Sequence, residues 1–95
     1  MNVLFTVHGI VQGVGYRWHV KSIAKQCNIA GYVKNMPDGS VEIFAIGAEK
    51  DIKNFEDKIN VYLEYGIKVM HIERMENAVK GSESKIPRGT FEIIR

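Results

Sequence analysis

The sequence lacks the features that mark secreted and membrane proteins. Cys27 is its only cysteine, so no internal disulfide can form and a disulfide-stapled secreted domain is excluded. No apolar run approaches the roughly 18–20 residues that cross a bilayer, and the N-terminus has no basic leader segment. We therefore expect a cytoplasmic protein without a membrane partner.

The sequence also has almost no excess of one sign of charge. Thirteen basic and eleven acidic residues leave a net charge of +2, and both signs are scattered along the chain. This balance provides no electrostatic basis for a nucleic-acid partner. The histidines at positions 8, 19 and 71 have no metal-ligand spacing, and Cys27 does not complete one. These spacings predict no metal site. We also expect a monomer.

What is present is an alternation of strand and helix patterns. Alternating or β-branched runs predict strands, and apolar positions at helical spacing predict helices. The predicted elements are a strand at 3–8, a helix at 16–28, strands at 32–36 and 41–46, a helix at 49–65, and strands at 67–75 and 90–94. Pro37-Asp38-Gly39-Ser40 predicts a hairpin turn, and residues 77–89 form a polar connector.

This order, β-α-β-β-α-β plus a terminal strand, predicts the architecture. Two β-α-β crossovers that place both helices on one face of an antiparallel sheet give a ferredoxin-like α/β sandwich, of the α+β class. At 95 residues and with no interdomain linker, the chain is one domain over residues 1–95. This fold hosts many functions, so function has to be argued from a site.

The most informative segment is residues 9–17, which read GIVQGVGYR between a predicted strand and a predicted helix. A glycine-rich turn at a helix N-terminus lets several backbone N–H groups point at one anion. No Gly-Lys-Ser/Thr ends the run, and Trp18 stands where a dinucleotide fingerprint needs a third glycine. Alternatively, the glycines only allow positive φ, with Arg17 solvated. A cation at a helix N-terminus is unfavourable without an anion, so Arg17 favours a phosphate cradle.

Asn35 is the second candidate residue, because asparagine is depleted in strands. One interpretation is that it stabilises the following turn. The other is that its amide, which donates and accepts hydrogen bonds without charge, holds a water molecule beside a phosphoryl group. In the predicted sheet, the glycine-rich loop and residue 35 can meet at one edge.

Residues 9–17, together with 31–35 (GYVKN) and 38–41 (DGSV), resemble the two signature blocks of the acylphosphatase family, in order and with fitting separation. The resemblance extends to the length, the element order and the terminal FEIIR strand, so it spans nearly the whole chain. Ile10 departs from the pattern, since a basic residue is common there. Because the loop acts through backbone groups, we expect Ile10 to tune affinity or loop stability.

The resemblance implies a small cytosolic enzyme that hydrolyses acyl phosphates to a carboxylate and phosphate without metal or cofactor. It implies that Arg17 and the loop amides bind the phosphoryl group and that Asn35 positions the attacking water. The loop residues expected to bind through their backbone are Val11, Gln12, Gly13, Val14, Gly15 and Tyr16. The partner is then a small-molecule acyl phosphate.

Other functions compete with this one. A non-catalytic module could bind phosphate or an acyl phosphate in the same cradle, although a pure binder has no need of a water-positioning Asn35. The chain could also be a domain of a larger carbamoyl-phosphate-using maturation enzyme, but it lacks the expected zinc-finger-like cysteines. An RNA-binding sheet would need an aromatic or basic strand face, which the sequence does not indicate.

Overall fold

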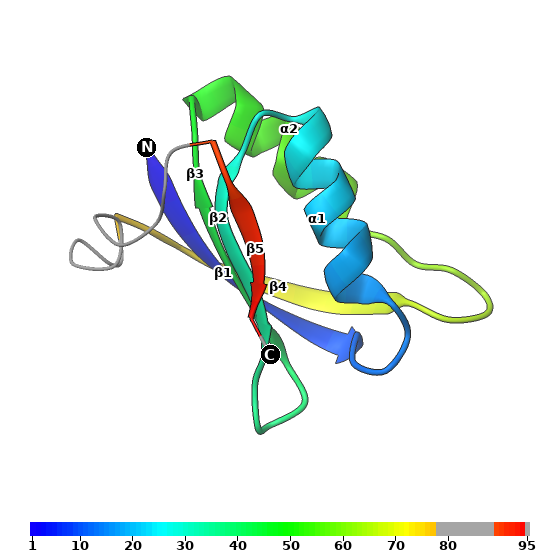
Figure 1. Cartoon of the computed structure of the whole chain (residues 1–95). Helices are drawn as coiled ribbons and strands as arrows, with labels where there is room; N and C mark the ends of the chain where they lie inside the picture. Colours follow the sequence, from blue (N-terminus) through cyan, green and yellow to red (C-terminus); the bar gives the residue numbers. More distant parts are fainter. Residues whose placement is uncertain (78–88, 95) are drawn as a thin grey trace.

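The structure, a computed structural model, describes residues 1–77 and 89–94. These residues follow the predicted order of strands and helices (Figure 1). The elements are β1 (Asn2–Ile10), α1 (Tyr16–Gln26), β2 (Ala30–Asn35), β3 (Val41–Ile46), α2 (Glu49–Ile59), β4 (Lys68–Glu76) and β5 (Phe91–Ile94). The predicted connector at 77–89 lies outside the described residues except at its two ends.

The strands form one sheet in the order β4-β1-β3-β2-β5. The pairs β1–β3, β1–β4 and β2–β3 are antiparallel, as expected, but β5 pairs with β2 in parallel. The sheet is therefore mixed rather than wholly antiparallel. Only β2 and β3 are joined by a tight hairpin, which forces antiparallel pairing. β5 follows β4 after residues 77–90 and joins the opposite edge of the sheet, so no tight turn sets its direction.

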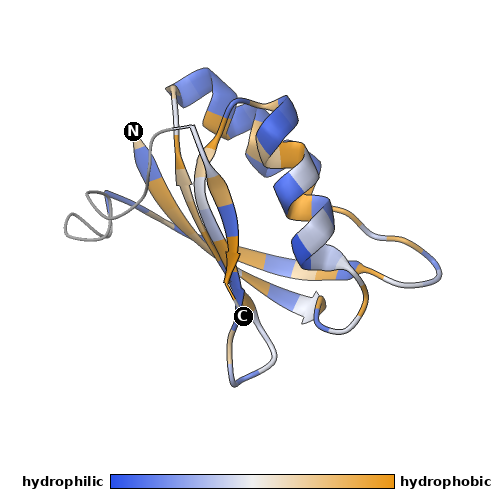
Figure 2. Ribbon diagram, viewed as in Figure 1, coloured by the Kyte–Doolittle hydropathy of each residue, from blue (hydrophilic) through white to orange (hydrophobic). Residues whose placement is uncertain are grey.

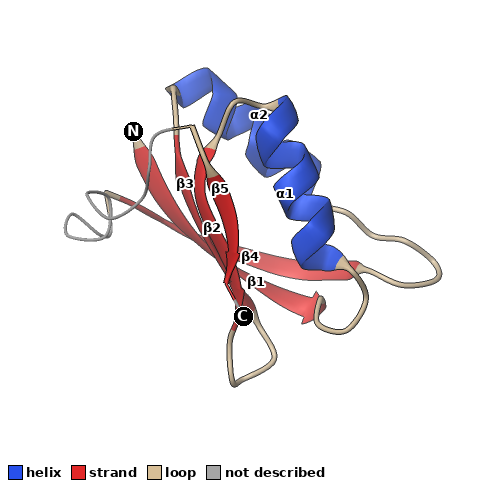
Figure 3. Ribbon diagram, viewed as in Figure 1, coloured by secondary structure: helices blue, strands red, loops and turns tan. Residues whose placement is uncertain are grey.

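Both helices cover the same face of the sheet, as Figures 1 and 3 show. The core lies between these layers, where Val3, Phe5 and Val7 of β1 are fully buried. The Phe55 ring of α2 lies 6.2 Å from the Phe5 ring and 6.1 Å from that of Phe91, measured between centroids. Each such ring contributes about 1.5–3 kcal/mol through burial. Hydrophobic and hydrophilic residues alternate along strands and helices (Figure 2), as a two-layer fold requires.

The second helix is shorter than its sequence pattern predicts. It ends at Ile59 rather than at residue 65, because the following backbone turns toward β4. The Leu63 N–H donates to the Ile67 carbonyl at 2.8 Å, and Tyr62 forms a β-bridge with Lys68. Tyr62 and Leu63 share the apolar stripe of the helix in sequence, yet they are 63% and 48% exposed.

The first strand is longer than predicted and runs directly into the glycine-rich loop. Its pairing with β4 continues past a bulge after His8, so that Gly9 faces Val69 and Ile10 faces Lys68. A Cβ atom on Gly9 would lie 2.1 Å from the Lys68 carbonyl oxygen, so this close approach requires glycine. The start of the loop is thereby fixed against β4.

Candidate active site

The loop between β1 and α1 takes its shape from two glycines. Gly13 and Gly15 have φ values of +73° and +81°, in the left-handed region that side chains disfavour. A Cβ atom on either would meet nothing within 4 Å, so backbone conformation rather than crowding calls for glycine. The loop is open at these positions, while Val11 is buried in the core. The loop is thus anchored in the core at Val11 and open at Gly13 and Gly15.

The loop ends in the N-terminus of α1, which is electrostatically positive. The first turn carries no acidic residue, and among the described residues no side chain caps it. The His19 N–H donates to the Gly15 carbonyl at 3.1 Å, so the N–H groups of the preceding residues have no acceptor within the helix. These groups, with the helix dipole, favour an anion in front of the loop.

Tyr16 holds this helix end in place through its side chain. Its hydroxyl donates to the Ile59 carbonyl at 2.9 Å, and the side chain is buried. Burial raises the pKa of the Tyr16 phenol far above its usual value, so it stays protonated and keeps donating. The sequence prediction assigned Tyr16 a backbone role in the loop and did not include this contact with Ile59. An aromatic residue with a polar end at a helix start is the signal that could have indicated this second role.

Gln12 joins the loop to the β2–β3 hairpin, which the sequence prediction also missed. Its amide Nε2 donates to the Met36 carbonyl at 2.7 Å and to the Ser40 carbonyl at 2.8 Å. Met36 directly follows Asn35, the last residue of β2. One half-buried side chain thus brings together the two sequence blocks that carry the candidate site. A long amide in an otherwise small-residue loop was the available signal.

Arg17 extends from α1 to the same end of the sheet as the hairpin. Its Nη1 donates to the Ile94 carbonyl of β5 at 3.3 Å. Ile94 faces Lys34 in the parallel β2–β5 pair, and Asn35 is the next residue of β2. Within residues 1–77 and 89–94, no carboxylate pairs with Arg17. The guanidinium therefore sits at the end of β2 with donors left for a ligand.

Asn35 does not stabilise the turn that follows it. Asp38 does so instead, because its Oδ1 accepts hydrogen bonds from the Ser40 N–H at 2.9 Å and the Ser40 hydroxyl at 2.6 Å. These bonds lower the pKa of the Asp38 carboxyl. Asn35 Oδ1 is buried and has no hydrogen-bond partner among the described residues. An unsatisfied buried acceptor costs about 1–3 kcal/mol, so asparagine is held here at a cost to stability.

Asn35 also faces the helix-covered side of the sheet. It lies two residues after Val33, which is fully buried in the core, and alternate residues of a strand share a face. The loop, Arg17 and Asn35 thus lie on one side of the sheet and at one end of it, where β1, β2 and β5 end. His8 points elsewhere, with its Nε2 2.9 Å from a Glu73 carboxylate oxygen. In the described part of the chain, no three His, Cys, Asp or Glu side chains could hold a metal ion.

No helix in the described residues is long and apolar enough to cross a membrane.

The acylphosphatase family model matches residues 3–93. An acylphosphatase of Listeria monocytogenes is 38% identical over 91 residues, which cover 96% of this chain and 92% of that protein.

Solved structures agree with this match. The acylphosphatase from Bacillus subtilis superposes with a TM-score of 0.82 at 32% identity, covering 99% of this chain and 98% of that one. HypF from T. kodakarensis superposes with a TM-score of 0.80 at 32% identity, over 100% of this chain but 12% of that one. This chain therefore belongs to the acylphosphatase family, and its activity is that of an acylphosphatase, the hydrolysis of the carboxyl-phosphate bond.

Proposed function

We propose that acyl phosphates are hydrolysed at the end of the sheet where the 11–16 loop, Arg17 and Asn35 meet. The observation that carries this proposal is the pair of Gln12 hydrogen bonds, which join the loop to the hairpin that begins beside Asn35. The phosphoryl group would lie in the loop, where N–H groups of Val11 to Tyr16 and the start of α1 face it. Such preorganised donors stabilise charge without reorganising during the reaction.

Arg17 closes this cradle. With Nη1 resting on the Ile94 carbonyl, its remaining N–H groups can bind two phosphoryl oxygens at once. Phosphoryl transfer passes through a loose transition state with charge on the equatorial oxygens. A guanidinium fixed at that position stabilises this charge, and removal of one such donor typically costs about 10²–10³ in rate.

Asn35 orients the attacking water. Rotation about the terminal torsion of its side chain exchanges the carbonyl oxygen and the amide nitrogen, so either can face the cradle. The water oxygen forms a bond to phosphorus while the bond from phosphorus to the acyl oxygen breaks. The electron pair of that bond leaves with the carboxylate, and the water proton passes to a phosphoryl oxygen. The products are a carboxylate and inorganic phosphate.

This chemistry needs no general acid, since a carboxylate leaves without protonation. Asn35 contributes orientation rather than basicity, which is enough to accelerate a reaction strongly. The competing binding-module interpretation gives no reason to keep, at residue 35, a buried acceptor that has no partner within residues 1–77 and 89–94. The proposed role of Asn35 does.

Hydrolysis of benzoyl phosphate in the presence of EDTA tests the proposal. We expect Arg17→Lys to lose about 10²-fold or more in kcat/KM, since an ammonium keeps the charge but loses the planar fork. We expect Asn35→Ala to lose kcat while its inhibition constant for phosphate stays near that of the parent. Near-normal turnover by Arg17→Lys would contradict the first role. Weaker phosphate binding at unchanged kcat in Asn35→Ala would contradict the second.

The proposal also places the enzyme in the cytoplasm as a monomer. Cys27 supports a reducing compartment, because it is a buried free thiol in the core. Light scattering of the purified protein would measure its mass, and a dimer would contradict the monomer.

A further inference from the structure

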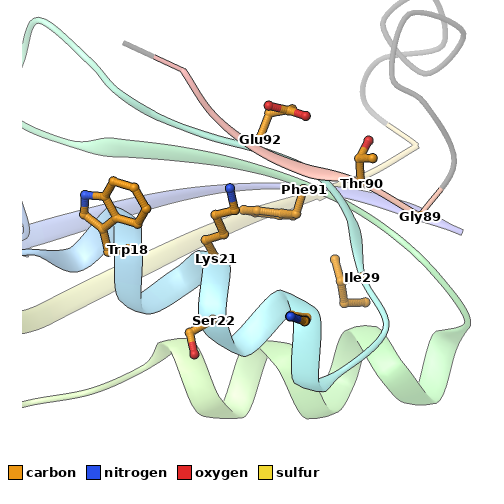
Figure 4. A pocket seen from close by; sticks show the side chains of 9 residues that line it. Trp18, Lys21, Ser22, Ile29, Gly89, Thr90, Phe91 and Glu92 are labelled. Atoms are coloured by element: carbon orange, nitrogen blue, oxygen red, sulfur yellow. The ribbon is translucent and has the colours of Figure 1, made fainter.

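A groove lies between α1 and β5, and Figure 4 shows the side chains that line it. Its volume is about 540 Å³, within the range of small-molecule sites. Trp18, Lys21 and Lys25 line it from α1, and Phe91 and Glu92 line it from β5. We call it the α1–β5 groove.

The groove adjoins the position proposed for the phosphoryl group. Trp18 directly follows Arg17 in α1, and the guanidinium of Arg17 is bonded to Ile94, two residues beyond Glu92 in β5. Figure 4 shows Trp18 at one end of the groove and Thr90 toward the other. A substrate held by its phosphoryl group must place its acyl group outside the loop, and this groove begins beside Arg17.

The walls of the groove combine an apolar surface with positive charge. Phe91 and Ile29 are buried apolar residues of the lining, while Trp18 is 59% exposed. The Lys21 ammonium lies 5.9 Å from the centroid of that ring. Lys25 lies one turn further along α1, about 10 Å from Trp18 at 1.5 Å per residue. Among the lining residues that the structure describes, two ammonium groups face one carboxylate, that of Glu92, which makes this part of the groove net positive.

We propose that the α1–β5 groove binds the acyl group of the substrate and favours flat acyl groups that carry a second negative charge. A flat group would stack on the exposed Trp18 ring, and a carboxylate on its far side would face Lys21 and Lys25. This inference rests on the proposed function, because the phosphoryl group has to be anchored at Arg17. It adds a specificity that the cradle alone does not supply, since the cradle contacts only the phosphoryl group.

A series of four substrates tests the proposal: acetyl phosphate, benzoyl phosphate, 4-carboxybenzoyl phosphate and its neutral 4-carbamoyl analogue. Each variant is compared with the parent on the same substrate, so differences in leaving-group reactivity cancel. Trp18→Ala should lower kcat/KM for the three aromatic substrates about 3–10-fold and leave acetyl phosphate within about 2-fold. Because Trp18 is largely exposed, its replacement leaves the core intact.

The charged residues give effects of opposite sign. Lys21→Gln should lower kcat/KM for 4-carboxybenzoyl phosphate alone, by about 2–5-fold, and Glu92→Gln should raise it by a similar factor. Lys50→Gln is the matched control, since Lys50 is an exposed lysine of α2 outside the groove lining. Equal effects of Lys21→Gln and Lys50→Gln would overturn the proposal. So would an equal loss on acetyl phosphate in Trp18→Ala.

A binding measurement separates this proposal from the proposed function. Trp18 is the only tryptophan of the chain, so its fluorescence reports directly on the groove. Titration with terephthalate in the presence of inorganic phosphate should quench it, with a dissociation constant about 2–5-fold higher in Lys21→Gln. Absence of hydrolysis of all four substrates with intact quenching would contradict the proposed function only. Absence of quenching in an active enzyme would contradict the proposal that the α1–β5 groove binds the acyl group.

Discussion

Replacing Gln12 by methionine tests whether the glycine-rich loop is held by its contact with the hairpin. The change keeps the length and approximate volume of the side chain but removes both donated hydrogen bonds, to the Met36 and Ser40 carbonyls. Neither carbonyl is left unsatisfied. The Gly39 N–H still donates to Met36 at 3.1 Å, and the Met36 N–H still donates to Ser40 at 2.9 Å.

The expected magnitude follows from these contacts. A net contribution of about 0.5–1.5 kcal/mol per hydrogen bond gives a loss of about 2 kcal/mol in the free energy of unfolding, with no added desolvation penalty. For a domain of this size, that loss lowers Tm by about 8–16 °C. Because the loop then moves relative to Asn35, kcat should fall roughly 10-fold or more. Phosphate affinity should change less, since the glycine conformations and the start of α1 shape the loop itself.

The assay combines urea unfolding with kcat and the phosphate inhibition constant, measured on one preparation. Gln12→Glu is the informative companion, because a carboxylate can only accept and would face two carbonyl oxygens. It should be less stable than Gln12→Met at neutral pH, and the gap should close when acid protonates the carboxylate. The reasoning is refuted if Gln12→Met melts within about 2 °C of the parent with its kcat unchanged.

Three further predictions concern stability. Gly9→Ala should lower the free energy of unfolding in urea by about 3 kcal/mol or more, because the added Cβ would clash with the Lys68 carbonyl oxygen. Gly13→Ala should lower it by about 1–2 kcal/mol, because the site has space for a Cβ but a positive φ. Tyr16→Phe should cost about 1 kcal/mol through loss of the bond to Ile59; equal stability would contradict this. Asp38 has a lowered pKa, so its contribution is present above about pH 4 and disappears as the pH falls through that lowered value; Asp38→Asn should flatten this part of the pH–stability curve.

Sequence patterns predicted the elements well where one pattern dominated. Residues 41–46 form β3 as predicted, and the start of α1 at Tyr16 is also confirmed. The end of α2 was misplaced, because Ile59, Tyr62 and Leu63 keep helical spacing in sequence. The bridge between Tyr62 and Lys68 of β4, which the helical spacing does not indicate, shows that the backbone turns away after Ile59.

Strand pairing and side-chain contacts were harder to predict from the sequence than the helices and strands themselves. The final strand is evident in sequence, but nothing in its residues specifies whether it pairs in parallel with β2 or antiparallel with another strand. The proximity of the loop to residue 35 could be expected from the fold. The Gln12 contacts could not, since a glutamine amide has no periodicity and its acceptors are two backbone carbonyls 24 and 28 residues away.

The hydrogen bond from Arg17 to Ile94 has a consequence for biosynthesis. Arg17 leaves the ribosome 77 residues before Ile94, whose carbonyl holds its guanidinium. The loop and the first helix can form early, but β5 cannot dock on β2 until residues 91–94 have emerged. Until then, the nascent chain lacks the Ile94 carbonyl that places the Arg17 guanidinium.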